Sequence, residues 1–225
     1  YEDGKPVKPK HYLSWSKAGA IDEELIFVAG NPGRTNRLNT VAHLEFLRDR
    51  VYPNTLDMLR RREVLLRTFS ERGLENARRA QDELFGYQNS RKARLGALAG
   101  LQDPAVIEAK RKAERSLRQA AANDPKLRDA RDAWDEVATA LAAWNQIFVD
   151  YELYERGQAF NTELFTIARM LVRLSDESAK PNADRLREYA EAGLDSLKQH
   201  LFSEAPIYSD LETVKLTDSL GFLLE

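Results

Sequence analysis

The feature that most constrains this chain is a change of pattern near residue 38. Leu25–Ala29 is an apolar run of strand composition, and a Gly/Pro-rich turn follows it. From Asn39 onward, apolar residues recur at helical spacing for the rest of the chain. A lone hairpin is only marginally stable in water. The N-terminal strands are therefore expected to join a sheet outside this chain, or to pack on the helices.

The first 38 residues are predicted to form a β-hairpin. His11–Trp15 and Leu25–Ala29 have strand composition, and the polar residues 16–24 would connect them. Gly30, Pro32 and Gly33 are the predicted turn-forming residues after the second strand.

Residues 39–225 are predicted to form an antiparallel bundle of long helices, which makes the chain mainly α. Gly73 is a predicted helix end, whereas Asp103-Pro104 and Asp124-Pro125 are predicted helix starts. The predicted helices span about residues 40–52, 53–72, 74–101, 104–123, 125–157, 160–175, 181–202 and 209–224.

Two features of these helices lead to further expectations. Three glycines interrupt the helix over 74–101, and each costs about 1 kcal/mol relative to Ala, so a break or a close packing contact is expected there. Residues 74–123 fit a helical hairpin that protrudes or packs on another part of a parent protein. An aromatic stripe is expected to face the core, and its members are Trp134, Val137, Leu141, Trp144, Phe148 and Tyr151.

Composition argues against several classes of protein. The formal net charge is -2 with both signs mixed, whereas a dedicated nucleic-acid binder would show a basic excess. The chain has no cysteine, which excludes a disulfide framework and a Cys-based zinc site. No apolar run reaches the roughly 18 residues of a membrane span, and no charged-then-apolar leader is found in the chain.

No motif in the chain indicates catalytic chemistry. His11, His43 and His200 stand outside any nucleophile motif, and no Gly-x-Ser-x-Gly or His-Glu-x-x-His pattern occurs. The turn at residues 30–35 lacks the spacing and the lysine of a phosphate-binding loop. We therefore predict no catalytic residue, no metal ligand and no cofactor in this chain.

Phe27–Arg37, which reads Phe-Val-Ala-Gly-Asn-Pro-Gly-Arg-Thr-Asn-Arg, resembles a family signature. It is similar to the Gly-x-Pro-Gly-x-Thr-x-Arg pattern of bacterial dipeptidyl-peptidases 7 and 11 and dipeptidyl aminopeptidase BII. Tyr87–Lys92, followed by Gly96 and Gly100-Leu101, resembles the family's Asn-Tyr-Trp-Lys segment and the Gly-Leu after it, although this chain lacks the Tyr-Trp pair.

The resemblance implies a fold and an activity. Members of that family are secreted or periplasmic homodimeric serine exopeptidases that remove dipeptides from free peptide N-termini. A chymotrypsin-like double β-barrel carries their catalytic triad, and an inserted helical domain caps the cleft. Residues 1–38 would then be a junction with the barrel, and residues 39–225 an incomplete capping domain. The rest of the parent chain would hold the triad, so this chain alone is expected to be inactive.

The resemblance also implies one substrate contact. An Asn of the family's helical domain helps to hold the substrate's N-terminal ammonium, and Asn89 is the best match, with Asn36 as the second candidate. A side-chain carbonyl can accept a hydrogen bond from an ammonium group without adding a buried charge. The alternatives are a solvated helix residue for Asn89 and turn or N-cap bonding for Asn36.

Two other classes of protein remain open from the sequence. The chain could be a stand-alone helical interaction module that binds through residues 74–123 or through the aromatic stripe, or else a structural coiled coil. The N-terminal strands discriminate between these readings, because an autonomous bundle has no need of apolar strands with open edges.

Overall fold

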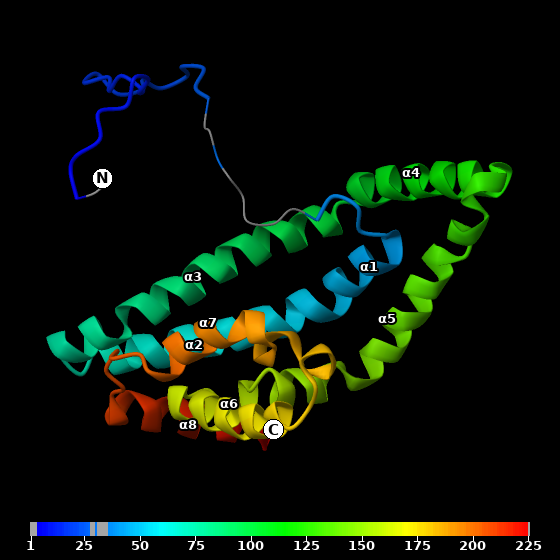
Figure 1. Cartoon of the computed structure of the whole chain (residues 1–225). Helices are drawn as coiled ribbons and strands as arrows, with labels where there is room; N and C mark the ends of the chain where they lie inside the picture. Colours follow the sequence, from blue (N-terminus) through cyan, green and yellow to red (C-terminus); the bar gives the residue numbers. More distant parts are fainter. Residues whose placement is uncertain (1–3, 28–29, 31–35, 225) are drawn as a thin grey trace. The chain divides into compact units, whose positions relative to one another are not determined.

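A computed structural model describes residues 4–27, 30 and 36–224. The chain divides into two compact units, residues 1–37 and residues 38–225 (Figure 1). The second unit is built from α-helices joined by short turns, so the predicted mainly helical class is confirmed. No helix in the described ranges is long and apolar enough to cross a membrane.

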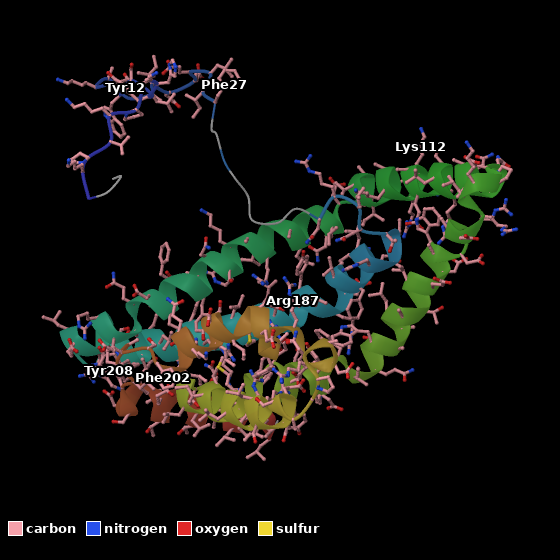
Figure 2. All side chains as sticks on the ribbon, viewed as in Figure 1. Tyr12, Phe27, Lys112, Arg187, Phe202 and Tyr208 are labelled. Atoms are coloured by element: carbon pink, nitrogen blue, oxygen red, sulfur yellow. The ribbon has the colours of Figure 1, made fainter. Side chains whose placement is uncertain are left out.

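The first unit contains no β-strand among its described residues. His11–Trp15 and Leu25–Phe27 run without regular hydrogen bonding, and Val28 and Ala29 lie outside the described residues. The rings of Tyr12 and Phe27 are exposed (Figure 2). A hairpin of two strands is only marginally stable by itself, and needs further strands or a packed surface to become stable. Pairing with strands of another domain stays a prediction.

The helical unit opens with one almost continuous helical run. It consists of α1 (Val41–Phe46), the π-helical turn η1 (Leu47–Val51) and α2 (Tyr52–Ser70). The Thr40 hydroxyl accepts a hydrogen bond from the His43 amide at 3.2 Å, which caps α1. Pro53 lies just after the π-helical turn, and its missing amide proton interrupts the regular hydrogen-bond ladder of the run at this point.

Helices α2 and α3 form the central pair of the bundle. Helix α3 (Leu74–Gln102) runs back along α2 after a turn of three residues (Figure 1). Helix α8 (Ser209–Leu223) packs on α2 near this turn. The core between them consists of Leu66, Phe69, Ala80 and Leu211, with Leu84, Tyr87, Tyr208 and Val214 packed against it.

The predicted hairpin over residues 74–123 is wrong. Helix α4 (Pro104–Asn123) leads on from the end of α3 instead of folding back beside it (Figure 1). Leu84 and Tyr87 of α3 pack against the core that α2 shares, whereas Phe85 and Leu95 stay exposed and are not covered by α4. Helix α4 packs on α1 instead, where Glu114 accepts a hydrogen bond from the Val41 amide at 2.7 Å. The predicted start is confirmed, since Asp103 caps the Ala105 amide at 2.8 Å.

The long helix predicted from residue 125 is divided in two. Residues Pro125–Ala130 form the 3-10 helix η2, and α5 (Ala133–Asp150) follows. The aromatic stripe of α5 faces the bundle as predicted: Phe148 is buried, and its ring centroid lies 5.7 Å from that of Phe46. The π-helical turn η3 (Tyr151–Glu155) ends before Gly157, whose φ of 70° lies in the left-handed region. This confirms the predicted helix end at Gly157.

Of the C-terminal helices, the one predicted over 209–224 is confirmed as α8, the one over 160–175 is shifted by three residues, and the one over 181–202 is much shorter than predicted. A 3-10 turn, η4 (Gln158–Phe160), precedes α6 (Glu163–Ser178), and α7 is only Leu194–Leu201. Three 3-10 turns fill most of the segment between them, namely η5 (Asn182–Asp184), η6 (Arg187–Tyr189) and η7 (Glu191–Gly193). At Gly193 a Cβ atom would lie 2.7 Å from the Glu188 carbonyl oxygen, so this tight path requires glycine.

Candidate functional site

Asn89 lies near the middle of α3, on a face that no other described part of the helical unit covers. Its side chain is exposed, and so are Phe85 one turn before it and Lys92 one turn after it. These residues are spaced three and four apart, so they share one side of the helix. The amide of Asn89 is therefore open to a binding partner outside this chain.

The glycines of α3 belong to the same exposed face. A Cβ atom built on Gly86, Gly96 or Gly100 would meet no heavy atom within 4 Å. The expected break is wrong, because α3 is continuous from Leu74 to Gln102, and the expected close packing contact is absent from the described residues. The result is a helix face with small side chains, on which another backbone can approach closely.

The second candidate, Asn36, belongs to the other unit. It is exposed, as is Gly30, whereas Pro32 and Gly33 lie outside the described residues. The structure therefore does not describe the predicted turn. Asn36 and Asn89 belong to different units of the chain.

A polar cavity lies elsewhere in the helical unit. Its volume is about 380 Å³, and α2, α3, α6 and the segment 152–162 enclose it. Most of its polar lining is cationic or neutral, with arginines from all three helices and only one carboxylate. The lining consists of Val51, Thr55, Met58, Arg62, Arg94, Glu152, Arg156, Gly157, Gln158, Phe160, Asn161, Thr162, Phe165, Thr166 and Arg169.

Glu152 and Gln158 pair at one wall of this cavity. The Gln158 side-chain amide donates to Glu152, and Gln158 is buried. Burial raises the pKa of the Glu152 carboxyl above its usual value, and the nearby Arg156 opposes this shift. The only carboxylate of the lining is thus already engaged.

Asn161 is a cavity residue that the sequence reasoning missed. Its backbone amide donates to the Ser219 hydroxyl at 3.1 Å. The Tyr87 hydroxyl on α3 donates to Glu83 at 2.5 Å. Burial holds the pKa of the Tyr87 hydroxyl well above its usual value. The available signal was the predicted helix end at Gly157, since polar residues in a short loop between helices commonly line sites.

The cavity and Asn89 are separate features. Arg94 lines the cavity from α3 and stands five residues after Asn89, which is about 140° around the helix at 3.6 residues per turn. A substrate ammonium would also be repelled by the arginines of the cavity. The cavity is therefore not the predicted ammonium site.

The histidines and carboxylates of the described residues form no metal cluster. No group of three or more His, Cys, Asp or Glu side chains gathers there in a way that could hold a metal ion. His200 on α7 instead lies 2.9 Å from the Glu163 carboxylate at the start of α6, which is a contact between helices.

Comparison with known proteins identifies the family. The chain is similar to an Asp/Glu-specific dipeptidyl-peptidase of Shewanella putrefaciens, with 31% identity over 196 residues. The aligned region covers 86% of this chain but 26% of that relative, so the chain spans about a quarter of the relative's length. No solved structure shows a significant match. The profile of the family described as Peptidase S46 matches residues 1–225, which confirms the resemblance seen in the sequence: the chain belongs to the peptidase S46 family.

Proposed function

We propose that this chain is the barrel junction and helical capping region of a longer serine dipeptidyl-peptidase, which removes dipeptides from free peptide N-termini. Membership of the S46 family and the similarity to a dipeptidyl-peptidase support this assignment. The catalytic triad would come from the rest of the parent chain. The helical unit would close one end of the cleft, exclude water and so strengthen polar contacts to the substrate.

The observation that carries the proposal is the open face of α3 around Asn89. The Asn89 amide is exposed in the middle of a long continuous helix, and nothing in the described part of the helical unit covers it. Its carbonyl oxygen would accept a hydrogen bond from the substrate's ammonium group. Phe85, 69% exposed one turn away, offers an apolar surface beside that contact.

Exposed apolar residues of the first unit support the proposed junction with a β-barrel domain. Several of its apolar side chains are exposed, and Leu13 and Trp15 are 97% and 92% accessible. Such residues need cover, and pairing with the strands of a β-barrel domain would supply it. The rest of the parent chain is thus the first partner, the peptide substrate the second, and a second copy in a homodimer the third. By family resemblance we place the parent protein in the periplasm or outside the cell.

The test is dipeptide release from fluorogenic substrates with a free N-terminus, including substrates with acidic side chains. Four samples are compared: the full natural protein, its Asn89→Ala variant, its Gln102→Ala variant and the 225-residue chain alone. Gln102 is the matched control, because it is an exposed amide at the end of the same helix. A hydrogen bond to a charged group contributes about 1.5–3 kcal/mol, so Asn89→Ala should lower kcat/KM by roughly 10- to 150-fold.

The outcomes separate the parts of the proposal. Full activity in the Gln102→Ala variant, a large loss in Asn89→Ala and no activity in the chain alone would support it. If the full protein is active and Asn89→Ala does not lower its activity, Asn89 does not bind the substrate ammonium, but the peptidase assignment stands. A folded full-length protein that is inactive on the whole panel would favour a helical interaction module instead.

A further inference from the structure

The cavity beside α6 gathers more positive charge than its own carboxylate can balance. Four arginines line it: Arg62 from α2, Arg94 from α3, Arg156 after η3 and Arg169 from α6. Glu152 is the only acidic residue of the lining, and its carboxylate accepts from Gln158. Guanidinium groups stay charged at all relevant pH values, so the cavity carries a lasting excess of positive charge.

None of these four guanidiniums lies within 4.0 Å of a carboxylate in the part of the chain that the structure describes. By contrast, Arg91 and Arg173 elsewhere in the bundle bind Glu63 and Glu155 at 2.5 Å. The cavity arginines thus differ from arginines that serve as partners in ion pairs between helices.

The contacts that the cavity arginines do make use few of their donors. The Arg62 guanidinium lies 5.6 Å from the centre of the Tyr87 ring. One Nη of Arg94 donates to the Ser90 carbonyl oxygen at 3.3 Å. Arg169 donates to the Glu155 carbonyl oxygen through one Nη. Each guanidinium has five N–H donors in a planar fork, so most of them are left for a ligand or for water.

The start of α6 also borders the cavity, but its amides are taken. The Leu164 amide donates to Glu212 and the Phe165 amide donates to the Thr162 hydroxyl, each at 3.2 Å. The arginines, and not the helix end, are therefore the groups available to hold a ligand.

We propose that this cavity binds a small dicarboxylate. Guanidinium forks match carboxylate geometry in a bidentate way, and two carboxylates can engage several forks at once. The volume of about 380 Å³ falls within the range of small-molecule sites. It offers room for a molecule larger than a bare phosphate ion. The ligand would be either a free dicarboxylic acid or a short peptide with acidic side chains.

The test is calorimetric titration of the full natural protein at low salt. The probes are succinate for the free acid, aspartyl-aspartate for the peptide, and inorganic phosphate as the competing oxyanion. The test variant Arg62→Gln/Arg94→Gln is compared with Arg60→Gln/Arg128→Gln, which removes the same charge from exposed arginines outside the cavity. Arg156→Gln is the second test variant, because its exposed side chain makes misfolding a small risk.

The expected result is saturable binding of succinate or of the peptide at one site, weakened at least tenfold in the test variants and unchanged in the control. Whichever of the two probes binds more tightly identifies the source of the ligand. The proposal is overturned if no probe shows saturable binding, if phosphate binds most tightly, or if the control variant loses as much binding affinity as the test variants. Binding should persist in Asn89→Ala, so the outcome does not depend on the proposed peptidase activity.

Discussion

Trp15 and Phe69 are aromatic residues of the same chain with opposite surroundings. Trp15 in the first unit is 92% exposed, whereas Phe69 in the helical unit is completely buried between α2, α3 and α8. Large aromatic side chains contribute most of their stabilising energy when they leave water. The helical unit therefore stabilises itself with its own residues, and the first unit does not.

This difference suggests which part of the chain can stand alone. The helical unit closes its core with segments that are far apart in sequence, since Leu66 on α2 and Leu211 on α8 belong to one cluster. The described residues of the first unit form neither helix nor strand. We infer that the first unit acquires its structure from the rest of a longer protein.

The largest expected effect is at Phe69. Phe69→Ala removes a fully buried ring from the core and should destabilise the helical unit by about 3–5 kcal/mol. Phe85→Ala on the exposed face of α3 is the matched control and should change stability by less than about 0.5 kcal/mol. Both values follow from urea unfolding monitored by circular dichroism. Equal effects at the two positions would contradict the described core.

The next effect concerns a buried carboxylate on α2. Glu63 is 5% exposed, and Arg91 on α3 donates to it at 2.5 Å. Arg91→Gln leaves this carboxylate without its closest partner and should cost about 1–3 kcal/mol. Arg115→Gln breaks the exposed pair with Glu108 and should cost about 0–1 kcal/mol. If Arg91→Gln costs no more than its control, the ion pair does not link α2 to α3.

A smaller effect depends on pH at the start of α3. Hydrogen bonds from Arg78, and then from Arg79, lower the pKa of Glu75 from 4.5 to about 2. A carboxyl whose pKa is lower in the folded state stabilises that state at pH values above its pKa in the unfolded chain. This contribution is lost as pH falls from about 4.5 to about 2. The stability gap between the native chain and Glu75→Gln should narrow over this range.

Glu75→Gln should change stability less than Arg91→Gln does, because the ion pair between Arg78 and Glu75 is exposed and screened by salt. Unfolding curves of both proteins at a series of pH values measure the gap. A stability difference that stays constant or widens as pH falls would contradict the ion pairs of Glu75 with Arg78 and Arg79.

The smallest expected effect on the 225-residue chain is at Trp15, in the first unit. Trp15→Ala should leave the stability of the 225-residue chain unchanged, because the ring contributes no buried area there. In the full natural protein the same change should destabilise, since the proposed barrel would cover this ring. Thermal unfolding of both forms checks this. A similar loss in the isolated chain would show that Trp15 already packs within it.

The sequence predicted the long helices well and the local interruptions poorly. Asp103-Pro104 and Gly157 marked real ends, because a capping side chain and a left-handed glycine act through local geometry. The 3-10 helix at Pro125–Ala130 and the turns before α7 were missed, because tertiary packing decides where a good helix former stops.

Neither the way the helices pair nor the arginine-lined cavity could be predicted from the sequence, because both depend on contacts between distant segments. Helical periodicity shows which face of α3 is apolar but not that α2, and not α4, covers it. Arg62, Arg94 and Arg169 are far apart in sequence and meet only in the folded bundle. For Asn89 the sequence offered an exposed helix position only as the alternative to substrate binding, and its proposed role came from the family resemblance.

The most direct test of the account is hydrogen–deuterium exchange over residues 11–15 and 25–27, measured in the 225-residue chain and in the full natural protein. If these residues form strands of a barrel whose other strands lie outside the chain, their amides should exchange quickly in the chain alone and at least tenfold more slowly in the full protein, while α2 and α3 stay protected in both. Equally fast exchange of these two segments in both proteins would contradict the proposed junction.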